Sequence, residues 1–203
     1  MTRNKARIAV LISGNGSNLQ AILDAAATGA LAHGTVELVI SSSSQAYGIT
    51  RARDAGVPVD VVRRQEFATQ AEFDDALSQI IDQYQIDLIV LAGYMNILSK
   101  QFVERYPNRI VNIHPSLIPA FSGPGFYGLK VHEAVVAAGV KVSGATVHYV
   151  TEVCDGGQIL AQETVPVYET DTPQDVQKRV LTEVEHIIYP RVIEQLSKEI
   201  AGN

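Results

Sequence analysis

The segment RIAVLISGNGSNLQAILDAAATG, residues 7–29, joins a buried strand to a helix through a glycine-rich turn. The run IAVLI is wholly apolar, as is typical of a strand that is covered on both faces of a sheet. From Ser17 onward, apolar residues recur at helical spacing until Gly29 ends the pattern. A strand, a glycine turn and a helix in this order predict the first unit of a parallel α/β sheet.

The turn SGNGSN, residues 13–18, has the composition of an anion site. Glycines allow a tight turn that brings backbone N–H groups and a helix N-terminus toward a phosphate. The third glycine of a dinucleotide fingerprint is absent, because Leu19 stands in its place, and no Gly-Lys-Ser/Thr of a Walker loop is present. The turn therefore indicates a cradle for one phosphate, with Gly16, Ser17 and Asn18 donating. A merely tight turn between strand and helix is the alternative.

Strand and helix patterns alternate through the front half of the chain. Strand patterns also occupy residues 36–41, 57–62, 87–93 and 110–114, and helical patterns occupy residues 46–56 and 70–85. The rear half has a short helix at 132–139, strands at 142–150 and 158–167 around the turn CDGG, and a long helix over 171–200. We predict a Rossmann-like, doubly wound α/β fold with a mostly parallel sheet, an antiparallel C-terminal hairpin and a long C-terminal helix.

The long C-terminal helix has a clear start and one expected interruption. Thr172 can cap it, Pro173 suits its first turn, and Asp175 completes a pattern similar to a capping box. Pro190 lacks a backbone N–H and should kink or break the helix.

The stretch IVNIHPSLIPAF, residues 110–121, ends a buried strand in polar residues. Side chains alternate along a strand, so Asn112 and His114 share one face, and Pro115 then stops the ladder. Open α/β sheets place their chemistry at strand ends of this kind. A pair of hydrogen-bonded residues without a catalytic role is the alternative.

The stretch GATVHYVTEVCDGG carries a second polar face. Alternation places Thr146 and His148 together, and Asp155 follows in a Gly-Gly turn. The alternative is that His148 is an ordinary cross-strand partner and Asp155 an ordinary turn residue. Nothing around Cys154 suggests an activated thiolate, so it receives no role.

The composition limits the function classes. The chain has 203 residues and a net charge of -6, which argues against a nucleic-acid groove. No apolar run approaches the roughly 18 residues of a membrane span, and the start MTRNKAR lacks the pattern of a signal peptide. One cysteine allows no internal disulfide, and the five histidines lack metal-ligand spacing. We expect a cytoplasmic protein without a metal, a nucleic-acid partner or a membrane.

Five segments occur in an order that resembles a known family. They are ISGNGSNLQAI, LAGYMNILS, NIHPSLIPAF, GATVHYV followed by DGG, and VEHIIYP, and they extend from about Arg7 to Pro190. Together they resemble the phosphoribosylglycinamide formyltransferases, the glycinamide ribonucleotide transformylases of purine synthesis. The resemblance implies transfer of the formyl group of 10-formyltetrahydrofolate to the amine of 5-phosphoribosylglycinamide, by a monomer or homodimer. It also implies a single formyltransferase domain over residues 1–203, with a phosphate-binding half at about 7–113 and a folate-binding, catalytic half at about 114–203.

The resemblance also implies roles for individual residues. The family's catalytic trio matches Asn112, His114 and Asp155. Its substrate site matches Gly16, Ser17, Asn18 and Glu185, the last of which holds the glycinamide end. Its folate site matches Met95, Asn96, Ile97 and Leu98, largely through backbone groups, together with His148 and Asp155. Without the resemblance, Glu185 would be read as a solvated helix residue.

These residue types suit the implied chemistry. A glycyl amine has a pKa of roughly 8, so a useful fraction is neutral and no enzyme nucleophile is required. The harder task is to stabilise the oxyanion that forms when the amine attacks the formyl carbon. Asn112 and a protonated His114 can both donate to that oxyanion, and each such donor typically contributes about 2.7–4 kcal/mol. Asp155 favours the charged imidazole and can relay a proton from amine to leaving nitrogen.

Four features depart from the family pattern. The run SSSS replaces the usual Ser-Asn after the second strand, and the loop FSGPGFYGLKVHEA, residues 121–134, is longer than in many relatives and could form a flap over the folate. We therefore assign no role to His132. Asn96 stands where many relatives have arginine, and the helix before Glu185 is shifted by one residue.

Three other functions compete with this interpretation. Formyltetrahydrofolate hydrolase resembles NIHHSFLP at the site, whereas Pro115 follows the histidine here, and it carries a further N-terminal domain. Methionyl-tRNA formyltransferase would need a C-terminal nucleic-acid-binding domain, and no basic extension is present. A catalytically silent nucleotide-binding module would use the glycine turn but not the trio.

Overall fold

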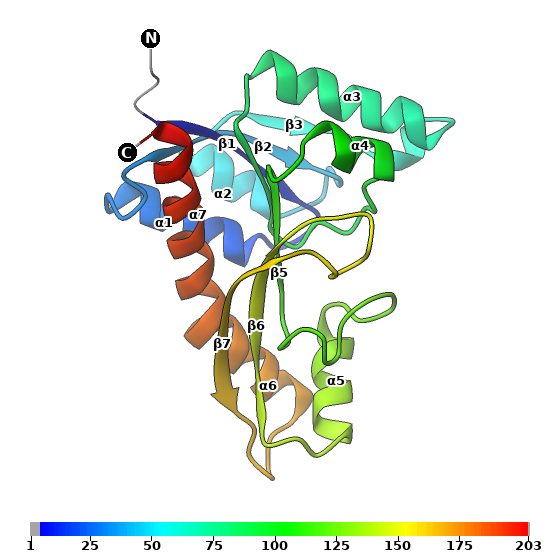
Figure 1. Cartoon of the computed structure of the whole chain (residues 1–203), viewed down its shortest axis with the longest axis vertical. Coiled ribbons are helices and arrows are strands. Elements are labelled where there is room, and N and C mark those ends of the chain that lie inside the picture. Colours follow the sequence, from blue (N-terminus) through cyan, green and yellow to red (C-terminus); the bar gives the residue numbers. More distant parts are fainter. Residues whose placement is uncertain (1–4, 203) are drawn as a thin grey trace.

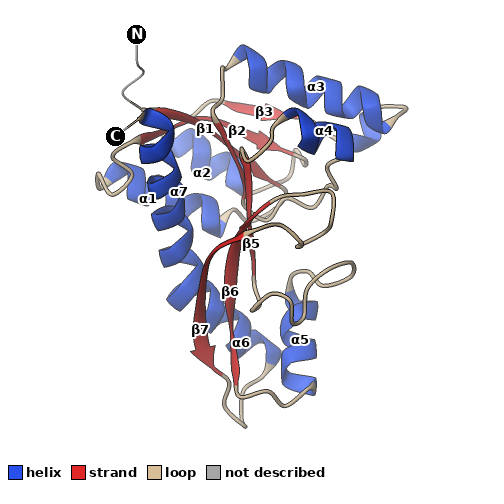
Figure 2. Cartoon of the chain, in the orientation of Figure 1, coloured by secondary structure: helices blue, strands red, loops and turns tan. Residues whose placement is uncertain are grey.

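Seven strands form one sheet in the computed structural model, which describes residues 5–202 of the chain (Figures 1 and 2). The strands are β1 (Ala6–Ile12), β2 (Gly34–Ser41), β3 (Val59–Val61), β4 (Leu88–Leu91), β5 (Ile110–His114), β6 (Val142–Tyr149) and β7 (Ile159–Pro166). They lie in the order β3-β2-β1-β4-β5-β6-β7, with parallel pairing from β3 to β5 and antiparallel pairing of β6 with both β5 and β7. The predicted fold class is confirmed.

Helices cover both faces of this sheet. They are α1 (Ser17–Ala27), α2 (Gly48–Asp54), α3 (Gln70–Gln83), α4 (Lys100–Arg105), α5 (Leu129–Ala137), α6 (Pro173–Val180) and α7 (His186–Ala201), with a short 3-10 turn at Arg64–Glu66 and a π segment at Leu181–Glu185. In Figure 1, α1, α2 and α7 lie on one side of the parallel strands, and α3 and α4 lie on the other.

The core has two parts because the side chains of each strand alternate. In β1, Ile8, Val10 and Ile12 join the cluster that contains residues of α1, α2, α6 and α7. Ala9 and Leu11 point to the opposite face and join the cluster beneath α3 and α4. All five side chains are fully buried, which explains why the strand pattern is continuously apolar rather than alternating.

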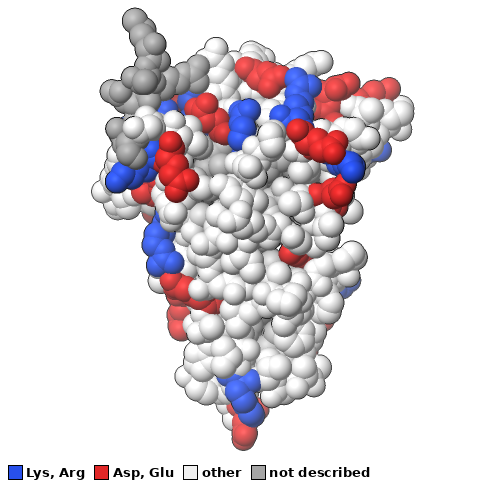
Figure 3. All heavy atoms as spheres, viewed as in Figure 1, with Lys and Arg blue, Asp and Glu red and all other residues white. Residues whose placement is uncertain are grey.

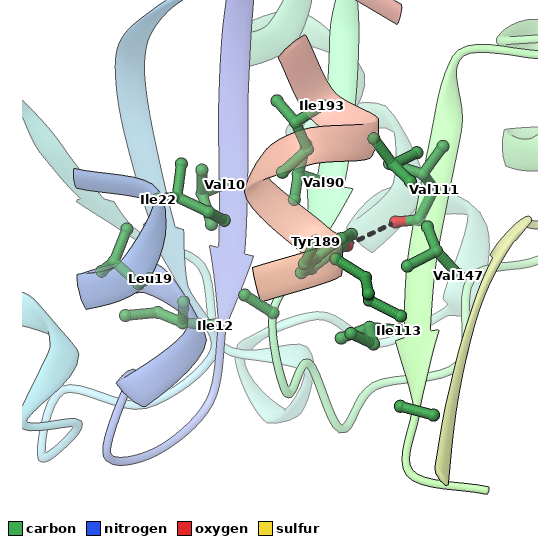
Figure 4. Packing of buried hydrophobic residues seen from close by; sticks show 14 of the residues in the cluster. Val10, Ile12, Leu19, Ile22, Val90, Val111, Ile113, Val147, Tyr189 and Ile193 are labelled. Atoms are coloured by element: carbon green, nitrogen blue, oxygen red, sulfur yellow. Dashed lines mark hydrogen bonds between the residues drawn. The ribbon is translucent and has the colours of Figure 1, made fainter. Parts of the chain in front are cut away.

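Tyr189 fastens α7 to the centre of the sheet (Figure 4). Its ring is fully buried, and its hydroxyl donates to the carbonyl oxygens of Leu91 at 2.8 Å and Val111 at 3.1 Å. Burial raises the pKa of this phenol well above its usual range, so the hydroxyl stays a donor. The helix is thus bonded to the ends of both β4 and β5.

The strand order places a switch point between β1 and β4, where open α/β sheets form a crevice outside the carboxyl ends of the strands. From β1 the chain crosses to β2 on one side, and from β4 it crosses to β5 on the other, so the two loops at the carboxyl edge diverge. Ligands of open α/β sheets bind at such a switch point. Here the Ser13 hydroxyl oxygen accepts hydrogen bonds from the Met95 N–H at 2.8 Å and from the Ser42 hydroxyl at 2.6 Å. These bonds link the start of the loop after β1 to the loops that follow β2 and β4.

The C-terminal helix differs from the prediction. Thr172 and Asp175 form the expected capping box, but the expected break at Pro190 is wrong, because α7 continues through this residue. Pro190 is buried in the core side of α7, where packing outweighs one missing backbone bond. The irregularity lies upstream, in the π segment 181–185.

One helix boundary and one whole helix were also missed. Helix α5 begins at Leu129, before the predicted start at 132, because the chain turns out of the preceding loop at Gly128 with a φ of 55°. The sequence interpretation also had no helix at α4. That helix begins after Ser99, whose side chain caps the N–H of Phe102 at 3.1 Å.

The surface carries charges of both signs. On the face in Figure 3, acidic and basic side chains are interspersed near the top, and the central area is largely uncharged. Within residues 5–202, no helix has the length and apolar character needed to cross a membrane.

Candidate active site

The polar faces of β5 and β6 meet at the carboxyl end of β5. Antiparallel pairing sets Asn112 opposite His148 and His114 opposite Thr146. The Asn112 amide nitrogen lies 3.2 Å from His148 Nε2. Ile113 points to the other face and joins the apolar core. The predicted alternation along both strands is therefore correct.

Asp155 joins this group from the turn after β6. Its carboxylate lies 3.4 Å from His114 Nδ1 and 3.6 Å from His148 Nε2, and it accepts the N–H of Gly123 at 2.8 Å. Burial alone would raise the pKa of Asp155. The hydrogen bonds from His148 and Gly123 and the nearby histidine charges outweigh burial and hold this pKa below its usual value. Amide, imidazole and ionised carboxylate thus converge from two distant segments.

The hydrogen bonds of His148 orient Asn112. His148 Nδ1 lies 2.9 Å from the carbonyl oxygen of Tyr149, which can only accept, so Nδ1 donates. Nε2 faces both the Asn112 amide nitrogen at 3.2 Å and the Asp155 carboxylate at 3.6 Å: without a proton it accepts from Asn112, and with a proton it donates to Asp155. Within residues 5–202, no other group accepts a hydrogen bond from this amide, so its second N–H can donate to a reacting oxygen.

The ring of His114 is held at both nitrogens. Nε2 lies 2.9 Å from the carbonyl oxygen of Phe121 and must donate to it. Nδ1 faces the Asp155 carboxylate at 3.4 Å, and the side chain of His114 is only 5% exposed.

The glycine turn leads into α1 in the geometry of an anion cradle. Gly16 is the N-cap of α1 and has a φ of 74°. Within residues 5–202, no group accepts a hydrogen bond from the N–H of Gly16, Ser17 or Asn18. Free N–H groups occur at the start of every helix, and the three at this one suit a phosphate.

Glu185 faces this turn from the π segment. It accepts a hydrogen bond from the Asn18 amide nitrogen at 2.6 Å and is only 7% exposed. Burial raises the pKa of Glu185 to about 7, although the Asn18 bond opposes the shift. The alternative of a solvated helix residue is thus wrong, and the carboxyl group stands beside the candidate phosphate site.

The candidate folate segment, residues 95–98, lies on the β4 side of the crevice. Met95 and Ile97 are 56% and 86% exposed, and Leu98 packs on the second core cluster. The Asn96 amide nitrogen lies 3.5 Å from the phenol oxygen of Tyr94. No hydrogen bond of the described chain joins this segment to Asn112, His114 or Asp155, so its role stays a prediction.

The chain matches a protein-family model over most of its length. Residues 6–193 match the family model described as Formyl transferase. The chain belongs to the formyl transferase family.

Individual relatives in this family are similar over most of the chain. Phosphoribosylglycinamide formyltransferase of Escherichia coli is 45% identical over 92% of this chain and 84% of its own length. The cattle trifunctional purine biosynthetic protein adenosine-3 is 42% identical over 94% of this chain, which spans only 18% of that longer protein. The crystal structure of glycinamide ribonucleotide transformylase 1 from Symbiobacterium toebii has a TM-score of 0.90 at 44% identity and covers 97% of this chain and 89% of its own.

The long loop of this formyl transferase contacts both charged members of the trio. We call residues 121–128 the site loop. Its main chain supplies the Phe121 carbonyl that accepts from His114 and the Gly123 N–H that donates to Asp155. Phe121, Gly123, Gly125 and Gly128 have positive φ values, which explains the excess of glycine. The sequence interpretation saw the loop's length and glycine content but assigned it no contact.

The other histidine near the trio does not create a metal centre. His132 of α5 is 1% exposed, and its pKa falls to about 4 because it is buried and, secondly, because His114 is close. It is therefore neutral, in agreement with the absence of an assigned role. Among residues 5–202, no three His, Cys, Asp or Glu side chains group as metal ligands would.

Arg51 of α2 is a polar neighbour of the glycine turn that the sequence interpretation missed. Its guanidinium donates to the backbone and side-chain oxygens of Asn15. A basic residue a few positions into the second helix was the only available signal. Nothing in its spacing connects it with the turn, because the contact depends on the packing of α2 beside α1.

Proposed function

We propose that the chain transfers the formyl group of 10-formyltetrahydrofolate to the amine of 5-phosphoribosylglycinamide. The products are N-formylglycinamide ribonucleotide and tetrahydrofolate, and the step belongs to de novo purine biosynthesis. The convergence of Asn112, His114 and Asp155 at the sheet edge that also carries the glycine turn supports this most strongly. The names of the similar E. coli and S. toebii proteins support the same substrate class.

The first step is attack of the neutral glycyl amine on the formyl carbon. The free N–H of Asn112 and the positive charge of His114 stabilise the oxyanion that forms on the formyl oxygen. His148 keeps the Asn112 amide in the donating orientation. No covalent intermediate with the protein is needed, because the amine is itself the nucleophile.

The second step moves a proton and releases the folate. In the tetrahedral intermediate the attacking nitrogen is an ammonium, and the leaving folate nitrogen must gain a proton as its bond to carbon breaks. Asp155, ionised in this structure, accepts the proton from the ammonium, directly or through water, and passes it to the leaving nitrogen. The carboxylate ends in its starting state.

Substrate binding divides between the two sides of the crevice. We assign the phosphate to the N–H groups of Gly16, Ser17 and Asn18, and the glycinamide end to Glu185. The folate lies along the backbone of residues 95–98, near His148 and Asp155. By this assignment, residues from about 7 to 113 bind the phosphate and part of the folate and supply Asn112, and residues from about 114 to 203 supply His114, Asp155 and Glu185.

A direct assay tests this function. Purified protein is incubated with 10-formyltetrahydrofolate and 5-phosphoribosylglycinamide, and the formylated product is measured. Formate release without an acceptor would instead indicate the hydrolase. Phosphate binding without any turnover would indicate the silent module. Sedimentation of the same sample distinguishes a monomer from a homodimer, and cell fractionation tests the cytoplasmic location that we infer.

A further inference from the structure

Arg51 makes three hydrogen bonds on the far side of the glycine turn. Its Nε donates to the Asn15 carbonyl oxygen at 2.9 Å, and one terminal nitrogen donates to Asn15 Oδ1 at 3.0 Å. The other terminal nitrogen donates to Gln20 Oε1 at 3.0 Å, in the first turns of α1. One planar side chain therefore bridges the turn and the helix that follows it.

The direction of these bonds determines where the turn's N–H groups point. The Asn15 carbonyl and the Gly16 N–H belong to one trans peptide plane and point in opposite directions. Because Arg51 holds that carbonyl toward α2, the Gly16 N–H points away from α2. The Gly14 carbonyl is held in the same way by the Gly48 N–H at 3.1 Å. Two successive carbonyls thus face α2, which leaves the next N–H groups for a ligand.

Close packing keeps Arg51 and the turn in this arrangement. A Cβ on Gly16 would lie 2.8 Å from the Cα of Gly48, so turn and helix are in backbone contact. The ring of Tyr47 lies against the guanidinium, whose central carbon is 4.9 Å from the ring centroid. The side chain is therefore restrained by the ring as well as by its hydrogen bonds.

We propose that Arg51 is the positioning residue of the phosphate site. It aims the N–H of Gly16, and through Gln20 the start of α1, at the substrate phosphate, and it takes no part in formyl transfer. This inference rests on the proposed function. It predicts that Arg51 controls affinity for the phosphorylated acceptor and leaves the chemical step and the folate site unaffected.

The test compares Arg51→Gln, Arg51→Lys and Arg53→Gln. Arg53 is an exposed residue of the same helix with no hydrogen bond to the turn in the described part of the chain, so Arg53→Gln removes the same charge and serves as the control. Binding of inorganic phosphate is measured by calorimetry, and steady-state kinetics are measured with 5-phosphoribosylglycinamide and with its dephosphorylated form. Thermal unfolding verifies that each variant is folded.

We expect Arg51→Gln to weaken phosphate binding at least tenfold and to raise KM for the phosphorylated acceptor by a similar factor. Its kcat and its KM for folate should stay within about threefold of the wild-type values. Its KM for the dephosphorylated acceptor should change little. Arg51→Lys keeps the positive charge but loses the planar set of guanidinium donors that bonds to both Asn15 and Gln20. This variant should therefore bind phosphate at least threefold more weakly than the wild type. Arg53→Gln should match the wild type.

Unchanged phosphate binding in Arg51→Gln, or in Arg51→Lys if the first variant does not fold, would overturn the inference. Equal weakening in Arg53→Gln would also overturn it, because net charge would then explain the effect. Wild-type protein that binds phosphate but transfers no formyl group would contradict the proposed function alone. The calorimetric comparison would still decide the role of Arg51.

Discussion

Asn112, His114 and Asp155 are each held by a neighbour of a different kind. A histidine side chain orients the amide, a backbone carbonyl fixes the imidazole, and a backbone N–H holds the carboxylate. Strand alternation was enough to place Asn112 and His114 on one face. The contact of the site loop with Asp155 could not be predicted, because it depends on positive φ angles that a pattern of glycines permits but does not specify.

Asp155→Asn tests the proton relay. The amide retains an oxygen for the Gly123 N–H but loses the charge opposite His114, so turnover should fall by about 10²- to 10⁴-fold. Unfolding free energy should change by no more than about 2 kcal/mol. Formyl-transfer kinetics and urea unfolding provide both values. Glu152→Gln, which neutralises a 53% exposed carboxylate in the same segment, is the control and should resemble the wild type. Turnover of Asp155→Asn within threefold of the wild type would contradict the relay.

Glu185→Gln tests the buried carboxyl group through the pH dependence of stability. The folded pKa of about 7 exceeds the ordinary value of 4.5, so the folded state keeps this proton longer than the unfolded state. The stability due to the neutral carboxyl is therefore complete below pH 4.5 and is lost as the pH rises to 7. Glutamine stays neutral at every pH. The unfolding free energy of Glu185→Gln relative to that of the wild type should therefore rise by roughly 2 to 3 kcal/mol between pH 5 and pH 8.

Denaturant unfolding of both proteins at the two pH values measures this difference. The contributions of all other titrating groups to the pH dependence are the same in both proteins and cancel. The same variant should bind the glycinamide substrate more weakly at pH 8, where the wild-type carboxylate is charged. A constant difference in stability between pH 5 and pH 8 would show that the Glu185 pKa is not raised.

At the scale of the elements, the strand, turn and helix around the glycine turn were predicted well and the C-terminal helix less well. The turn follows from local composition, and the positive φ at Gly16 agrees with the predicted tight turn, whereas its phosphate-binding role stays a prediction. The π segment and the continuation through Pro190 depend instead on packing of the helix against the sheet. A local rule for proline could not anticipate that outcome.

Gly16→Ala should disrupt the turn, whereas Gly14→Ala should not. At Gly16 a methyl group would lie 2.8 Å from the Gly48 backbone in a left-handed conformation, and at Gly14 it would meet no atom within 4 Å. We expect Gly16→Ala to lower unfolding free energy by about 1–3 kcal/mol and to weaken phosphate binding at least tenfold. Urea unfolding and calorimetry compare the two variants. Equal effects of the two substitutions would contradict the cradle geometry of the turn.

At the scale of the whole molecule, the site exists because strand pairing brings remote segments together. Alternating strands and helices predicted a doubly wound sheet, and the rear strands predicted a hairpin. The strand order and the pairing of β5 with β6 were not available from local patterns, yet they set Asn112 opposite His148. Family motifs supplied what local physics could not, because they fixed which distant segments belong to one site.

Tyr189→Phe tests how α7 is fastened to the sheet. The substitution removes the hydroxyl that bonds to Leu91 and Val111 without changing the buried volume. Unfolding free energy should fall by about 1–2 kcal/mol in urea titrations. Tyr168→Phe is the control, because Tyr168 is 57% exposed, and its effect should stay within about 0.5 kcal/mol. Equal stability of Tyr189→Phe and the wild type would mean that packing alone holds the helix.

The site loop holds His114 and Asp155 through main-chain groups only. Substitution of the exposed Pro124 and Tyr127 would leave both bonds in place, whereas adding or deleting a residue between Phe121 and Gly123 would shift them out of reach. A library of loop variants should therefore tolerate chemical diversity at these exposed positions and almost no diversity of length between Phe121 and Gly123. That asymmetry makes the loop a position where binding of altered folates could be evolved without rebuilding the catalytic trio.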